Sequence, residues 1–68
     1  MKIKKGTLRV VSSRRKGTFE AEALRDFDTE DEFYPVTPLS EVRGLANVWN
    51  YGDEIPCRKG LAEIQVKE

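Results

Sequence analysis

The chain of 68 residues contains no histidine and a single cysteine, Cys57. One cysteine excludes an internal disulfide, and one thiol without any imidazole excludes an ordinary zinc site within one chain. A catalytic cysteine needs a neighbouring base, so the apolar neighbours of Cys57 indicate a small buried core residue instead. We therefore expect no metal, no cofactor and no thiol chemistry.

Long apolar runs are also missing. No stretch approaches the roughly 20 residues that a membrane-spanning helix needs. The lysines of residues 2–5 are not followed by an apolar segment, so we do not expect them to belong to a secretory signal. We expect a cytoplasmic protein that makes no membrane contact, and the single cysteine is consistent with a reducing compartment.

The residue patterns of common active sites are absent too. The sequence has no glycine-rich phosphate loop and no Ser-His-Asp set, and nothing places two carboxylates across a cleft. The acidic stretch that starts at Asp26 begins like a calcium-binding loop, but it lacks the central glycine and has Thr37 at the twelfth position. A chain this short leaves little room for both a core and a deep pocket. We expect no enzymatic activity and infer no small-molecule substrate.

Charge is sorted along the chain, although the net charge is zero. Residues 1–17 hold seven of the twelve basic residues and no acid, which gives +7. Residues 18–42 hold eight of the twelve acids and one base, which gives −7. Such asymmetry is typical of a surface that faces a polyanion or a charged partner.

Two sets of candidate contact residues follow from this sorting. The first set consists of basic residues expected to line one end of the first hairpin and to contact nucleic acid or another polyanion. Its members are Lys2, Lys4, Lys5, Arg14, Arg15 and Lys16. The second set combines an exposed acidic loop with a tyrosine in a turn, as a contact surface for a partner. Its members are Asp28, Glu30, Asp31 and Tyr51.

Apolar residues recur with a period of two in the first third of the chain, which is typical of half-buried β-strands. The pattern predicts strands over 7–12 and 18–23, joined by a loop over 14–17 in which Gly17 takes a positive φ. Leu8 and Val10 are expected to face the core. The expected cross-strand pairs are Ser13–Thr18, Val10–Ala21, Leu8–Ala23 and Arg9–Glu22.

The rest of the chain reads as short elements separated by turns. A third strand over 32–36 is expected to be an edge strand or a bulged strand, since Pro35 removes a ladder donor. Residues 37–44 have the Thr-Pro start and the glycine end of a short helix. A strand over 47–49 and a turn over 50–53 follow. A final hairpin is expected, with strands over 54–58 and 61–66 around Lys59 and Gly60.

Five or six short strands and one helical turn predict a single domain over residues 1–68. The fold class is all-β and mainly antiparallel, arranged as a small SH3-like barrel, with an OB-like barrel as the alternative. Closure would remove the exposed edges that invite aggregation.

The functional hypothesis that follows is a non-enzymatic protein-interaction module with a bipolar charged surface. A protein partner or a second copy of the chain is the expected ligand, because a marginal core without disulfide or metal favours self-association. Nucleic-acid binding through the basic set is the alternative. A lesser alternative is an acidic decoy that occupies the site of a nucleic-acid-binding protein.

Overall fold

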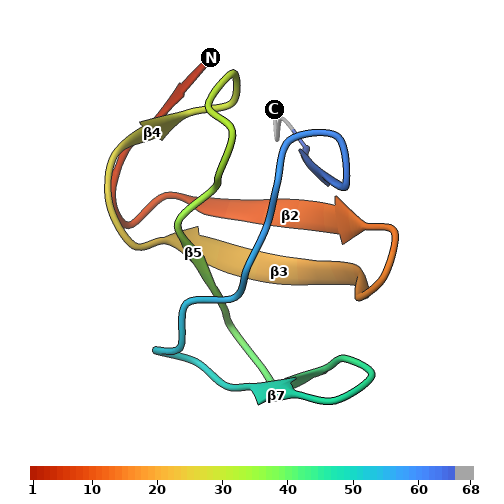
Figure 1. Ribbon diagram of the computed structural model, residues 1–68. Helices are drawn as coiled ribbons and strands as arrows, with labels where there is room; N and C mark the ends of the chain where they lie inside the picture. Colours follow the sequence, from red (N-terminus) through yellow and green to blue (C-terminus); the bar gives the residue numbers. More distant parts are fainter. Residues whose placement is uncertain (66–68) are drawn as a thin grey trace.

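The computed structural model describes residues 1–65 as an all-β protein built from antiparallel strand pairs, without a helix (Figure 1). The predicted fold class, all-β and mainly antiparallel, is therefore confirmed. The strands are β1 (Lys2–Ile3), β2 (Leu8–Ser13), β3 (Gly17–Ala23), β4 (Phe27–Asp28), β5 (Val36–Pro38), β6 (Val42–Arg43), β7 (Val48–Trp49) and β8 (Ala62–Ile64).

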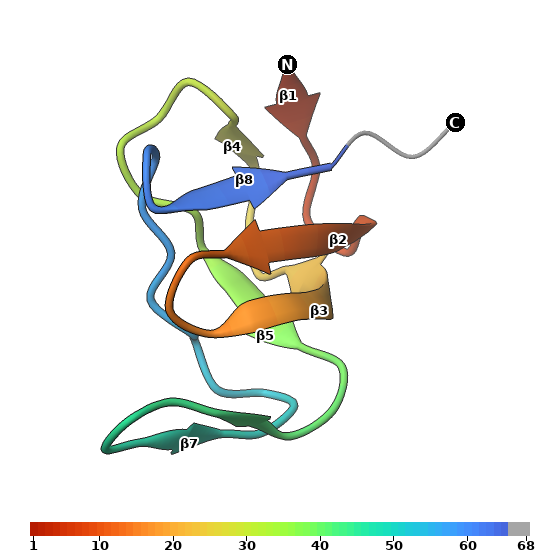
Figure 2. The same ribbon diagram turned by 90° about the vertical axis from the view of Figure 1, so that its right-hand side faces the viewer.

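A four-stranded sheet in the order β5-β3-β2-β8 forms the centre of the molecule. Two two-stranded pairs, β1 with β4 and β6 with β7, lie above and below it in Figure 2. No sheet closes into a barrel among residues 1–65. The apolar side chains enclosed by these strands are Ile3, Val11, Ala21, Ala23, Phe27, Tyr34, Val36, Val42, Ile55, Cys57 and Ala62.

The β2–β3 hairpin forms where the sequence predicts it, but its register differs by one residue. Ser13 pairs with Gly17 rather than with Thr18, because Gly17 (φ 78°) already belongs to β3 and leaves a three-residue turn. A glycine in the left-handed region after a short turn is a common hairpin arrangement. The observed pairs are Ser12–Thr18, Val11–Phe19, Val10–Glu20, Arg9–Ala21 and Leu8–Glu22.

This shift reverses which side chains of β2 face the core. A slip of one residue moves every side chain of a strand to the opposite face of the sheet. Val11 is fully buried, whereas Leu8 is 51% exposed, so the prediction that Leu8 and Val10 form the core face was wrong. The inward positions of β3 were predicted correctly, since Ala21 and Ala23 are buried.

The predicted helix over residues 37–44 does not form. Thr37 and Pro38 belong to β5 and pair with β3, and Val42 begins β6. The Thr37 hydroxyl, expected to cap the helix, is buried and accepts a hydrogen bond from the amide of Gly52 at 2.7 Å. A helix of two turns has too few internal hydrogen bonds to offset its nucleation cost, so sheet pairing prevails.

The third predicted strand is displaced toward the C-terminus, and β5 starts at Val36. Residues 32–36 instead run antiparallel to residues 55–59 through isolated bridges and three backbone hydrogen bonds. The shared register places Pro35 opposite Pro56, between the hydrogen-bonded positions. Neither proline therefore removes a donor from this ladder.

The final predicted hairpin is also rearranged. Residues 58–62 form a tight turn, in which Leu61 and Ala62 donate to the carbonyl of Arg58. The strand after this turn, β8, pairs with β2 rather than with residues 54–58. The predicted end of this strand at Val66 lies outside the described residues. The predicted strand at 47–49 and turn at 50–53 are confirmed by β7 and by the hydrogen bond from Asp53 to Asn50.

Gly44 was predicted to end a helix, but in the structure it provides space for the side chain of Trp49. Its φ is not positive, but a Cβ atom at this position would lie 2.8 Å from Cζ3 and 3.0 Å from Cη2 of Trp49. The missing side chain thus lets the indole ring pack against the backbone of the β6–β7 hairpin.

We expect Gly44→Ala to destabilise the protein by about 1–3 kcal/mol, because the methyl group and the indole ring would overlap. The emission maximum of Trp49 should shift as the ring moves. Chemical denaturation monitored by tryptophan fluorescence measures both effects. Ala46→Ser in the same hairpin is the matched control and should change neither value, and an unaltered Gly44→Ala protein would contradict the packing.

Candidate protein-interaction surface

The structure divides the six basic candidate residues into two groups at opposite ends of β2. Lys2, Lys4 and Lys5 precede this strand, and Arg14, Arg15 and Lys16 follow it. Six residues of extended strand separate the groups by roughly 20 Å. The six side chains therefore do not line one end of the hairpin as expected. We refer to Arg14, Arg15 and Lys16 as the basic turn.

The ion pairs of residues 1–65 do not include the basic side chains of residues 1–17. Five pairs are formed, and their cations are the N-terminal amine, Arg25, Arg43, Arg58 and Lys59. Within the described part of the chain, none of the seven basic side chains of residues 1–17 takes part in these pairs. Four of the eight acids of residues 18–42 do take part, so the two charged segments differ in how far they are neutralised internally.

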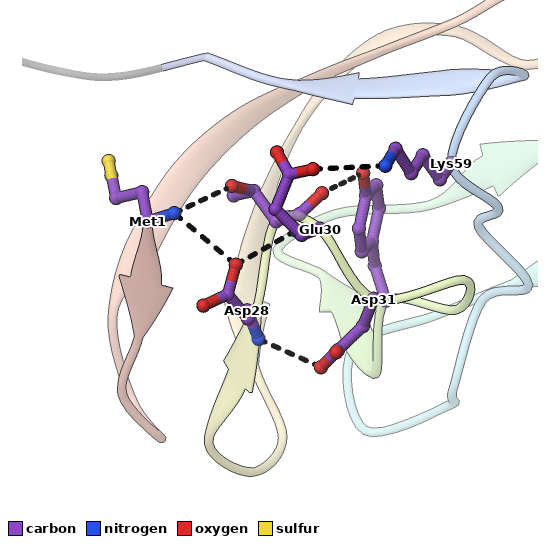
Figure 3. A network of polar contacts seen from close by, with 7 residues as sticks. Met1, Asp28, Glu30, Asp31 and Lys59 are labelled. Carbon is purple, nitrogen blue, oxygen red and sulfur yellow. Dashed lines mark hydrogen bonds and ion pairs between the residues drawn. The ribbon is translucent and has the colours of Figure 1, made fainter.

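The acidic candidate residues belong to an internal network (Figure 3). Asp28 Oδ1 accepts a hydrogen bond from the amide of Glu30 at 2.9 Å and lies 3.3 Å from the amine of Met1. Asp31 accepts from the amide of Asp28, and Glu30 pairs with Lys59 at 3.0 Å. These contacts order the loop between β4 and residue 33, so its carboxylates have structural roles.

Two pKa shifts follow from this network. The amide of Glu30 and the amine of Met1 stabilise the charged form of Asp28, which lowers the pKa of its carboxyl. The hydrogen bond to Glu30 raises the pKa of the Lys59 ammonium. The fourth candidate, Tyr51, is 61% exposed, and its hydroxyl donates to Glu22 of β3 rather than to the acidic loop. This bond raises the pKa of the Tyr51 phenol.

The basic turn lies beside the tip of the β6–β7 hairpin. Figures 1 and 2 both show the β2–β3 turn and this tip pointing to the same side of the molecule. The ammonium of Lys16 lies 5.4 Å from the centroid of the Trp49 ring, within the range of a cation–π interaction. An open hollow between the two turns is lined by Arg15, Lys16, Leu45, Ala46, Trp49 and Pro56, and we call it the apolar hollow.

A second hollow lies on the other side of the basic turn. It shares Arg15, Lys16 and Pro56 with the first, and it also contains the side chains of Ser13 and Arg58. Arg58 is paired with Glu32 at 3.1 Å, so Arg15 and Lys16 are the cations of this hollow that have no ion-pair partner in residues 1–65. Cations without partners at the border of two hollows favour the binding of an anionic group.

Sequence reasoning missed the apolar part of this surface. Leu45 directly follows the segment predicted to be a helix, and its side chain is fully exposed at 102%. Val48 of β7 is 51% exposed. We call Leu45, Ala46 and Val48 the apolar tip. The sequence feature that indicates this exposure is the short segment between Arg43 and Trp49. If residues 37–44 do not form a helix, this segment has the length of a hairpin turn.

Comparisons with protein-family models, with curated proteins and with solved structures give no match to this chain. Residues 1–65 contain no helix of the length and apolar character needed to cross a bilayer. Within the same residues, no group of three acidic or thiol side chains converges as a metal site would require.

Burial should make Cys57 unreactive in the folded protein. Its side chain is 4% exposed, and burial raises the pKa of the thiol to about 11. At pH 8 only about one thiol in a thousand would be ionised. We expect labelling by a thiol reagent to be at least about a hundredfold slower in buffer than in denaturant. Ser40→Cys in a Cys57→Ser background supplies an exposed control, and equal rates for Cys57 in both conditions would contradict its burial.

The lowered pKa of Asp28 predicts a specific acid dependence of stability. Ionised Asp28 stabilises the folded state above the pKa of an unfolded aspartate, about 4, and this contribution disappears as the pH falls through the lower folded pKa. We expect Asp28→Asn to be less stable at pH 7 and to show a flatter loss of stability toward pH 2.

Urea denaturation at a series of pH values measures this difference. Glu20→Gln, at an exposed position of β3, is the matched control and should keep the pH dependence of the wild type. An Asp28→Asn curve parallel to that of the wild type would show that the Asp28 network does not stabilise the fold.

Proposed function

We propose that this protein is a non-enzymatic interaction module that docks an acidic protein partner on the basic turn. The observation that carries the proposal is the unequal use of charge described above. Half of the acids of residues 18–42 are engaged in ion pairs, while none of the basic side chains of residues 1–17 takes part in one within residues 1–65. The basic turn thus carries positive charge that no ion pair of the described residues neutralises.

The fold we propose for this module is a partly open, SH3-like barrel. The ladder between residues 32–36 and 55–59 and the pairing of β8 with β2 support it, because they extend the sheet around the core on both sides. An OB-like barrel is less well supported, since residues 37–44 form no helix. In either class the turns at one end of the barrel are suited to binding.

Nucleic-acid binding is the second candidate, favoured by the same uncompensated cations. The separation of the two basic groups reduces the number of phosphates that one surface can contact from six to three. Three contacts on duplex DNA predict a slope of log K against log salt of about −3. The acidic-decoy function has weaker support, because Asp28 and Glu30 already pair with cations of the same chain.

Two triple variants test the proposal, since each removes three positive charges from a different end of β2. We expect Arg14→Ala/Arg15→Ala/Lys16→Ala to weaken binding of a labelled glutamate-rich peptide about tenfold, because each exposed charge contributes a few tenths of a kcal/mol or more. Lys2→Ala/Lys4→Ala/Lys5→Ala is the matched control and should have a much smaller effect. Fluorescence anisotropy at low salt measures both affinities.

A labelled DNA duplex of comparable charge is titrated in parallel. Tighter binding of the duplex than of the peptide at equal ionic strength would favour the nucleic-acid function instead. Equal losses in the two triple variants would indicate nonspecific attraction, and no peptide binding at low salt would refute the proposal.

A further inference from the structure

We propose that the surface recognises a short acidic peptide segment that also carries a large apolar side chain. This inference rests on the proposed function and specifies its ligand. The carboxylates of the segment would pair with Arg15 and Lys16. The apolar side chain would enter the apolar hollow and contact Leu45 and Trp49.

The exposure of the apolar tip is the first observation. Single exposed apolar residues are common and need no explanation. Here Leu45 at 102%, Val48 at 51% and the exposed Ala46 lie within four positions of one another on one hairpin. Leu45 therefore contributes nothing to the core, and its side chain is free to contact a ligand.

The second observation is that one hollow contains both kinds of contact. Its lining combines two cations, Arg15 and Lys16, with the apolar side chains of Leu45, Trp49 and Pro56. A ligand that fills it meets positive charge and apolar surface within the span of two or three peptide residues. This juxtaposition specifies an acidic residue close in sequence to an apolar one.

Charge complementarity determines the sign of the ligand. Arg15 and Lys16 have no ion-pair partner in the described chain, and the nearby carboxylate of Glu41 is already paired with Arg43. An anionic ligand therefore gains two contacts without displacing an existing ion pair. A cationic ligand would be repelled by the same side chains.

The surroundings of the Trp49 ring favour a peptide ligand over a nucleic acid. Its ring is half-buried, packs against the core, and lies close to the backbone of Gly44. Lys16 lies over the ring. Stacking of a base on the ring face that Lys16 covers would require the lysine to move away from it. An aliphatic or aromatic side chain can pack beside Leu45 without displacing Lys16 from the ring.

Two labelled pentapeptides of equal charge test the inference, Glu-Glu-Phe-Glu-Glu and Glu-Glu-Gly-Glu-Glu. We expect the phenylalanine peptide to bind the wild type about tenfold more tightly, because a partly buried aromatic side chain contributes on the order of this factor. Leu45→Ser should remove most of this preference while leaving the affinity for the glycine peptide unchanged. Val48→Ser removes an exposed apolar side chain of the same hairpin that does not line the hollow, so it should change the preference much less than Leu45→Ser.

Leu8→Ser is the matched control, since Leu8 is also exposed but lies at the other end of β2. It should keep the full preference for phenylalanine. Equal affinities of the two peptides for the wild type would overturn the inference while leaving the proposed function standing. An equal loss of preference in Leu8→Ser and Leu45→Ser would overturn it as well. Binding of neither peptide at low salt would refute both the inference and the proposed function.

Discussion

The register between β2 and β3 is the constraint on which the rest of the structure depends. Glycine at position 17 shortens the turn to three residues, and this places Val11 rather than Leu8 in the core. β2 then pairs with β8, and β3 pairs with β5, so both halves of the chain are aligned by this one hairpin. The same turn carries Arg14, Arg15 and Lys16 to the side of the β6–β7 hairpin.

The charged segments that are separate in the sequence lie side by side in the folded protein. The basic and acidic segments are adjacent in the fold, since β1 pairs with β4 and β2 pairs with β3. Later cations such as Arg58 and Lys59 neutralise the acidic loop, which leaves the earlier basic residues without ion pairs in the described chain. A sequence that sums to zero charge thus produces one turn with available positive charge. Exposed ion pairs contribute little to stability, so this distribution has little effect on the free energy of folding.

Short sequence patterns correctly predicted those elements whose structure depends mainly on residues close by in the chain. Alternation identified β3 and its inward alanines, and turn residues located the segment after Trp49. The helix over residues 37–44 was wrong because its capping signals compete with sheet pairing of Thr37 and Pro38, a contact over a long sequence distance. For the candidate surface, the sequence identified the residues of the basic turn, but it did not identify the exposure of Leu45. Exposure depends on which hairpin packs against which sheet, and a short sequence window does not contain that information.

Cross-strand proton contacts measured by NMR test the register most directly. The hydrogen bond from Ala23 to the carbonyl of Thr7 places Leu8–Glu22, Val10–Glu20 and Ser12–Thr18 at non-hydrogen-bonded positions, where α-protons of antiparallel strands approach closely. The structure predicts strong α-proton contacts within these three pairs. Strong contacts of Leu8 with Ala23 and of Val10 with Ala21 would contradict it. They would return Leu8 to the core and displace the basic turn from the apolar tip.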